Sequence, residues 1–151
     1  MIQHIDWKRA VLGGLAGTGA MTVLMLMAPL MGLPPMNIGK MLGSVMGGVE
    51  ALGWVAHLMI GTVLAIVYAA VFAGRLRGGP TTRGATYALL PWLIAQVVVM
   101  PMMGAGFFSG SALVAGASLM GHLVYGAVLG VVYGKSYEIE TASGDREHAH
   151  V

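Results

Sequence analysis

Two histidines inside long apolar segments are the side chains of this sequence best suited to chemistry. His57 opens the segment His57-Leu-Met-Ile-Gly-Thr-Val-Leu-Ala-Ile-Val-Tyr68, and His122 opens His122-Leu-Val-Tyr-Gly-Ala-Val-Leu-Gly-Val-Val-Tyr133. Seven of the twelve positions coincide, namely the His, Leu, Gly, Val, Leu, Val and Tyr. We therefore interpret the chain as a duplicated unit that carries one histidine in each copy.

A pair of imidazoles inside a membrane predicts a ligand site. Neutral imidazole is an axial ligand of haem iron and a common ligand of zinc and copper. We expect His57 and His122 to bind haem b or a (bacterio)chlorophyll, with Gly61 and Gly126, one turn after each histidine, leaving room for the flat macrocycle. The same histidine pair is a candidate metal site. A closed metal site needs more ligands, and methionines of the first and third apolar runs are the available ones.

Two other roles for the histidines stay open. Each imidazole can bond across a helix contact to Gln96, a threonine or a backbone carbonyl, and so fix the helix register. Alternatively, the histidines relay protons with Tyr68 and Tyr133, which follow them by eleven residues on the same helix face. Apart from Glu50 at the outer end of the second run, the long apolar runs contain no Asp or Glu that would support a relay.

The rest of the sequence offers little other chemistry. It has no cysteine and no Gly-x-Ser-x-Gly, His-Glu-x-x-His or phosphate-loop motif. Its net charge of +2 is too small to indicate binding to nucleic acid. We therefore expect a protein that is not an enzyme and that has no nucleic-acid partner.

Four long apolar runs position the histidines. The chain is 57% hydrophobic and 9% charged, whereas soluble domains are about a quarter charged. Runs of ~20 residues match the hydrocarbon core of a bilayer, in which a helix satisfies its own backbone hydrogen bonds. The sequence predicts an all-α integral membrane four-helix bundle, with spans at residues 10–31, 49–73, 84–103 and 112–133.

We interpret the chain, residues 1–151, as a single membrane domain made of two tandem helical-hairpin repeats. Repeat one covers about 9–74, and repeat two about 84–134. A cytoplasmic loop at 75–83 joins them, and a polar, flexible cytoplasmic tail follows at 135–151. Seven of the eight Lys and Arg residues fall on one side of the spans, which the positive-inside rule assigns to the cytoplasm. This predicts a multi-pass protein of the bacterial inner membrane with both termini in the cytoplasm.

Small residues spaced four apart place both histidines in helix contacts. The ridges are Gly53, His57, Gly61 and Ala65 in the second span, and Ser118, His122, Gly126 and Gly130 in the fourth. Small residues let helix backbones approach closely in membranes. Such ridges are more extensive than one bundle needs, which favours a larger membrane complex or a homo-oligomer as partner.

Three other features of the runs carry predictions. Residues 38–49 form an amphipathic segment after the N-cap Asn37, lying on the outer membrane surface or capping the bundle. The first span carries two methionine pairs four apart, a spacing similar to the Met-x-x-x-Met step of copper(I) transporters, although methionine also fills cores. In the third span Pro91 predicts a kink, and Gln96 either bonds a facing helix or lines a polar cavity.

Several short motifs are similar to those of an uncharacterised family of small bacterial membrane proteins with four predicted helices. They are Gly32-Leu-Pro-Pro-Met36 with Leu42-Gly43, Pro101-Met-Met-Gly-Ala-Gly106, and Gly121-His-Leu-Val-Tyr-Gly126 continuing to Tyr133-Gly134. The resemblance covers about residues 9–134 and implies a bacterial integral membrane protein. It implies no catalytic residues.

From the histidine pair and the near absence of extramembrane chain we expect an accessory or assembly subunit of a larger bacterial membrane complex. The complex would be respiratory or photosynthetic, with a haem or other tetrapyrrole held between the transmembrane histidines. The alternative is a small transporter or channel for a metal ion or other solute, in which His57, His122 and Gln96 are the deep polar residues that line the path.

Overall fold

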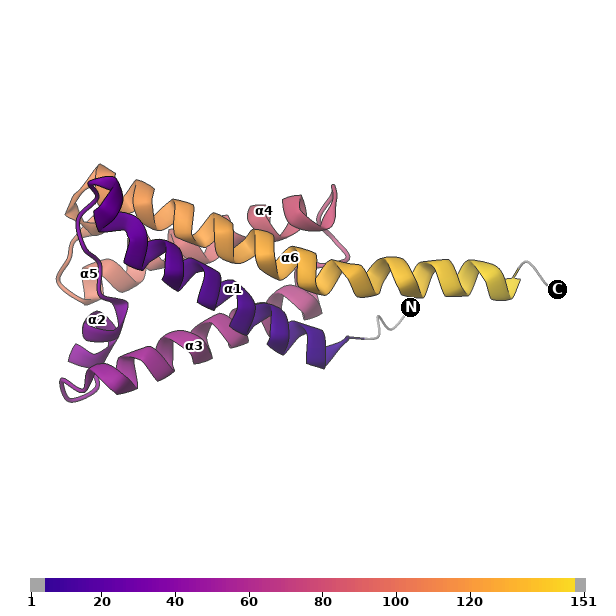
Figure 1. Cartoon of the computed structure of the whole chain (residues 1–151), viewed down its shortest axis with the longest axis horizontal. Coiled ribbons are helices and arrows are strands. Elements are labelled where there is room, and N and C mark those ends of the chain that lie inside the picture. Colours follow the sequence, from indigo (N-terminus) through magenta and orange to yellow (C-terminus); the bar gives the residue numbers. More distant parts are fainter. Residues whose placement is uncertain (1–4, 149–151) are drawn as a thin grey trace.

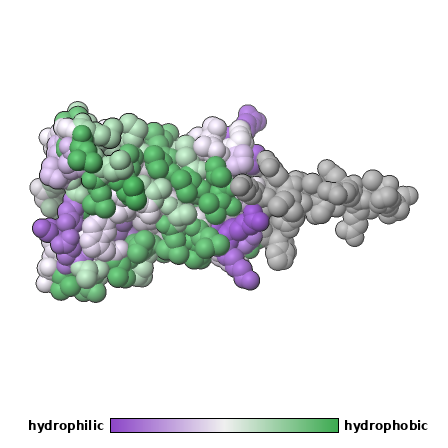
Figure 2. Space-filling view, viewed as in Figure 1, coloured by the Kyte–Doolittle hydropathy of each residue, from purple (hydrophilic) through white to green (hydrophobic). Residues whose placement is uncertain are grey.

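Four long helices dominate the computed structural model, which describes the backbone of residues 5–148 and the side chains of residues 5–134. The helices that are long and apolar enough to cross a membrane are Trp7–Met31, Glu50–Phe72, Pro80–Met102 and Ala112–Gly134. Figure 2 shows hydrophobic surface over the middle of the bundle and hydrophilic residues at its two ends. The prediction of an all-α, multi-pass membrane protein is confirmed, with span boundaries within four residues of those expected.

Short 3-10 and π-helical segments extend three of the spans. In chain order the elements are α1 (Trp7–Met27), η1 (Ala28–Met31), α2 (Ile38–Ser44), α3 (Glu50–Val67), η2 (Tyr68–Phe72), α4 (Pro80–Ile94), η3 (Ala95–Val99), α5 (Met100–Met102), η4 (Phe107–Gly110) and α6 (Ala112–His148). The segment between η2 and α4 lies at the same end of the bundle as both termini, which we call the terminal end (Figure 1). Helix α2 lies at the opposite end, the loop end (Figure 1).

The spans pack in the cyclic order α3, α1, α6, α4 (Figure 1). Helix α1 contacts α3 on one side and α6 on the other, and α6 also contacts α4. Helix α4 meets the second span chiefly through η2, near the terminal end. The two histidine-bearing helices, α3 and α6, are therefore diagonal to each other, as expected if two hairpins repeat around one axis. The duplication itself stays a prediction.

Glycines set the closest helix contacts. A Cβ atom at Gly84 of α4 would collide with the Gly126 carbonyl oxygen of α6, and one at Gly126 would collide with the Gly84 carbonyl. In the same way, Gly53 of α3 lies directly against the Gly39 carbonyl of α2. These contacts bury glycines of the predicted ridges within one chain. A larger complex or a homo-oligomer as partner stays a prediction.

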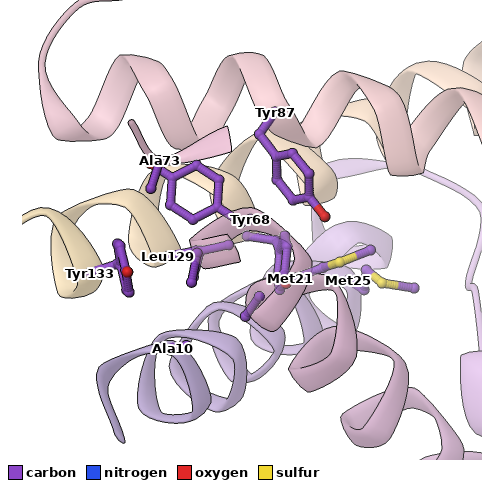
Figure 3. Packing of buried hydrophobic residues seen from close by; sticks show 11 residues of the cluster. Ala10, Met21, Met25, Tyr68, Ala73, Tyr87, Leu129 and Tyr133 are labelled. Atoms are coloured by element: carbon purple, nitrogen blue, oxygen red, sulfur yellow. The ribbon is translucent and has the colours of Figure 1, made fainter. Parts of the chain in front are cut away.

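The core is aromatic in the half of the bundle near the terminal end. Tyr68, Tyr87 and Tyr133, which we call the tyrosine cluster, are 1%, 2% and 7% exposed, and Leu129 beside them is fully buried (Figure 3). The Tyr68 ring centroid lies 5.2 Å from that of Tyr87 and 5.9 Å from that of Tyr133. These buried side chains fill the bundle on the terminal side of the histidines.

The amphipathic segment at residues 38–49 is shorter than predicted. Helix α2 begins after Asn37, whose side chain accepts a hydrogen bond from the Lys40 amide at 2.8 Å, so the predicted N-cap is confirmed. The helix ends at Ser44, because Gly47 and Gly48 adopt positive φ angles of 74° and 80°. Helix α2 packs against α3 and so caps the bundle at the loop end.

The polar tail, predicted to be flexible, is helical for most of its length; its flexibility stays a prediction. The backbone of α6 continues as a helix to His148, well past the end of the fourth span at Gly134. Extending an existing helix costs little compared with starting one, and residues 135–148 contain no proline. Residues 149–151 lie outside the described residues.

Candidate functional site: a histidine and methionine cavity

Both histidines line one cavity of about 130 Å³, which is partly open to the surface. His57 comes from α3 and His122 from α6, so the diagonal helices bring the two copies of the repeated segment to the same space. Residues of α1, α2 and the third span complete the wall. The structure thus brings both histidines to one cavity, as a shared site requires.

His57 has an unusual polar environment. Its side chain is 9% exposed, and its ring stands edge-on to Trp54 at a centroid distance of 6.3 Å. The buried Nε2 atom has no hydrogen-bond partner among the described residues. A buried polar atom left without a partner costs about 1–3 kcal/mol, so this nitrogen calls for a physical reason.

His122 is oriented by its own helix. Its Nδ1 atom lies 2.8 Å from the Ser118 carbonyl oxygen, four residues earlier. A carbonyl oxygen only accepts, so Nδ1 donates, and the lone pair of the neutral ring lies on Nε2. Metal-binding histidines commonly have this arrangement, because the backbone bond fixes the tautomer that leaves one nitrogen free to ligate.

Gln96 supports the site from outside the cavity. It is 1% exposed, its Nε2 atom donates to the Ser118 hydroxyl at 3.2 Å, and its Oε1 atom accepts from the Ser109 hydroxyl at 2.9 Å. The amide thus bonds a facing helix, which is the first of its two predicted roles. It is not among the residues that line the cavity. Sequence analysis did not identify Ser109 as its partner.

The two glycines predicted to leave room for a macrocycle have different surroundings. Gly61 lines the cavity, and a Cβ atom there would collide with the Thr18 hydroxyl of α1. Gly126 does not line the cavity and packs against Gly84 of α4. The small size of both residues is thus accounted for by helix contacts.

Tyrosines separate the cavity from the terminal end. The Tyr125 hydroxyl donates to the Gly61 carbonyl oxygen at 2.6 Å, and the Tyr87 hydroxyl donates to the Leu64 carbonyl oxygen at 2.7 Å. These bonds fasten α6 and α4 to α3. Tyr68 and Tyr133, the predicted relay partners, contact each other and do not line the cavity. Each lies about 16 Å along its helix from its histidine, at ~1.5 Å per residue.

Methionines are the other potential ligands of the cavity. Met21, Met25 and Met100 line it and are 7%, 8% and 6% exposed. A Cβ atom at Gly121 of α6 would lie 3.3 Å from Met21 and 3.9 Å from Met25, so both methionines of α1 pack against α6 at this position. Met21 and Met25 are one of the two methionine pairs predicted from their spacing in the first span. Met100 belongs to the third span, so the methionines come from the two spans that were predicted to complete a closed metal site. No group of three or more His, Cys, Asp or Glu suited to a metal occurs among the described residues.

Comparison with known proteins identifies a family but no activity. A model of a family of unknown function, DUF6789, matches residues 6–143. No curated protein and no solved structure matches the chain.

Proposed function

Since the chain belongs to the family of unknown function DUF6789, its activity has to be read from its own residues, and we propose that it holds a metal ion between His57 and His122. The observation that carries this proposal is the buried Nε2 atom of His57, which has no partner in the described structure and lines the same cavity as His122. A metal ion would bind this nitrogen and so offset the cost of burying it.

His122 supports the same proposal from the opposite side of the cavity. Its Nδ1–H bond to the Ser118 carbonyl leaves Nε2 as the ligating atom, and Gln96 braces Ser118. Ligands that are oriented before the ion arrives lose little freedom on binding. Two imidazoles alone do not close a tetrahedral site, so neighbouring methionines are needed to complete it.

A tetrapyrrole is the weaker candidate for this cavity. Pockets for drug-sized ligands measure about 300–1,000 Å³, whereas this cavity measures about 130 Å³. Gly126, predicted to make room for the macrocycle, is covered by α4. Haem b or a (bacterio)chlorophyll would require the helices to separate, but a single ion would not.

We place the protein among accessory or assembly subunits of a larger bacterial inner-membrane complex, and not among channels. The buried tyrosine cluster and Leu129 lie between the cavity and the terminal end, which supports a site that holds an ion over a channel. A site that retains an ion without conducting it suits delivery of that ion to another protein. The transporter alternative would require movement of this buried layer.

Metal content tests the proposal directly. We expect detergent-purified protein, incubated with Cu(I) or Zn(II) and desalted, to retain about one ion per chain. We expect a His57→Ala/His122→Ala variant to retain none. A Leu58→Ala/Leu123→Ala variant, altered at the residues next to the histidines, is the matched control and should retain the ion.

Two results would overturn the proposal. One is wild-type protein that retains neither ion. The other is a haem spectrum, with an absorption band that sharpens on reduction and disappears in the histidine variant, which would restore the tetrapyrrole hypothesis.

A further inference from the structure

From the methionines of two adjoining cavities we infer that the ion is Cu(I) and that it reaches the histidines from the loop end along a thioether-lined route. This inference rests on the proposed metal site and specifies its cation and its access. The route runs through a second cavity of about 240 Å³ between α1 and α6.

The side chains around the histidines select for a soft ion. Thioether sulfur binds Cu(I) and has little affinity for hard cations, and imidazole also suits copper. Met21, Met25 and Met100 are buried in the wall that His57 and His122 share. The chain has no cysteine, so thioethers are its only sulfur ligands. Two imidazoles with one or two thioethers make a complete neutral coordination shell.

Charge favours a monovalent ion in the same place. No Asp or Glu lines the cavity, so the protein supplies no negative charge to a bound cation. The cost of transferring an ion out of water rises with the square of its charge, which makes a divalent ion far more costly here than Cu(I). We therefore expect Zn(II) and Cu(II) to bind more weakly here than Cu(I).

The second cavity adjoins the site. Met25 and Met36 line both cavities. Farther out, the second cavity is lined by Met31 and Met120, which are 66% and 57% exposed. Both thioethers are thus accessible at the surface of the bundle. On this proposal an ion passes from Met31 and Met120 to Met25 and Met36, and then to the histidines.

Rate and affinity measurements separate the route from the site. The probe is Cu(I) held by a coloured chelator, which loses colour as purified protein in detergent takes the ion. Ag(I) serves as a redox-inert second probe. We expect a Met31→Leu/Met120→Leu variant to load several-fold more slowly with unchanged final affinity. A Met21→Leu/Met25→Leu/Met100→Leu variant should bind at least about tenfold more weakly.

The matched control removes two methionines outside both cavities. Met59 and Met102 are 62% and 81% exposed and line neither space, so Met59→Leu/Met102→Leu should load like wild type. Leucine keeps the apolar volume, and equal thermal stability would show that all variants fold.

The possible failures are distinguishable. Wild-type loading rates in the Met31→Leu/Met120→Leu variant would overturn the route and leave the metal site standing. Tighter binding of Zn(II) than of Cu(I) would overturn the assignment of the cation and also leave the site standing. No binding of any ion by wild type would overturn the proposed function and this inference together.

Discussion

His57 and His122 differ in how the protein holds them, although their local sequences are similar. His122 donates from Nδ1 to a backbone carbonyl, whereas the Nε2 atom of His57 is buried and has no partner in the described structure. If His57 binds a metal ion, burial of its unpaired Nε2 atom destabilises the metal-free protein. A variant with an apolar residue at position 57 should then be more stable than metal-free wild type. Under the packing hypothesis both rings should stabilise the fold.

Replacement of His57 by leucine distinguishes the two hypotheses. We expect His57→Leu to raise the unfolding free energy of the metal-free protein by about 1–2 kcal/mol, because leucine removes the unpaired polar atom. Thermal unfolding in detergent, with and without Cu(I), measures the effect. Added ion should stabilise wild type by mass action and leave the variant unchanged. A variant less stable than metal-free wild type would show that His57 is a packing residue.

Tyr125 offers a second test at the scale of one side chain. Its hydroxyl bonds the Gly61 carbonyl across the bundle, and Tyr125→Phe removes this bond while keeping the ring. Side-chain hydrogen bonds in membrane proteins average ~0.6 kcal/mol and reach ~1.7 kcal/mol, so we expect a loss of unfolding free energy in this range.

Thr62 provides the control for Tyr125. Its hydroxyl bonds only the Leu58 carbonyl of its own helix at 2.9 Å. Thr62→Val should therefore change the unfolding free energy by less than about 0.5 kcal/mol. An equal effect of both variants would contradict the assignment of a stabilising cross-bundle bond to Tyr125.

At the scale of elements, the fold depends on glycine contacts that let backbones touch. Gly84 and Gly126 join α4 to α6, and Gly39 and Gly53 join α2 to α3. Lipid tails are as apolar as the side chains they would replace, so close packing must supply much of the association energy. Gly53 and Gly126 were visible in the sequence as members of small-residue ridges, but their partners Gly39 and Gly84 were not.

A substitution that adds one methyl group tests the contact between α4 and α6. The Cβ atom of Gly84→Ala would collide with the Gly126 carbonyl, and the strain should lower the unfolding free energy by about 1–3 kcal/mol. Gly19→Ala is the matched control, because nothing lies within 4 Å of its Cβ position. Unfolding of both variants in detergent measures the difference. If Gly84→Ala were as stable as Gly19→Ala, the close approach of α4 and α6 would be wrong.

At the scale of the whole molecule, the two hairpins are joined unequally. Helix α1 packs along α6, whereas α4 meets the second span mainly through η2 near the terminal end. A strict two-fold repeat would make these two joints equivalent. The departure leaves space toward the loop end, where the cavity with His57 and His122 lies. Helix α2 covers this end of the first hairpin and has no equivalent in the second.

The placement of both termini at one end gives a topological prediction. Lys8, Arg9, Arg75, Arg77 and Arg83 all belong to the terminal end, and Lys40 lies on α2 at the loop end. By the positive-inside rule, fluorescent reporters fused to either terminus should fluoresce in the cytoplasm. A reporter active only outside the cytoplasm should work when inserted between Gly47 and Gly48. The reverse pattern would place the cavity on the cytoplasmic side and contradict delivery of an ion from outside.

The sequence by itself determined the class of the protein, the four spans, the helix faces that carry the histidines and the N-cap at Asn37. These features follow from apolar run length, residue spacing and capping chemistry, all of which are local. The length of the terminal part of α6 was not predicted, because a polar composition is compatible with both a helix and a flexible tail.

Only the tertiary structure decided what surrounds the histidines. The Ser109 partner of Gln96, the cover of Gly126 by α4 and the methionines around the cavity depend on how helices distant in the sequence are rotated and packed. A ridge of small residues indicates that a helix packs closely against another helix, but it does not identify that helix. The choice between a macrocycle and a single ion therefore depends on a cavity volume, which is set by packing between helices and is not encoded in any one of them.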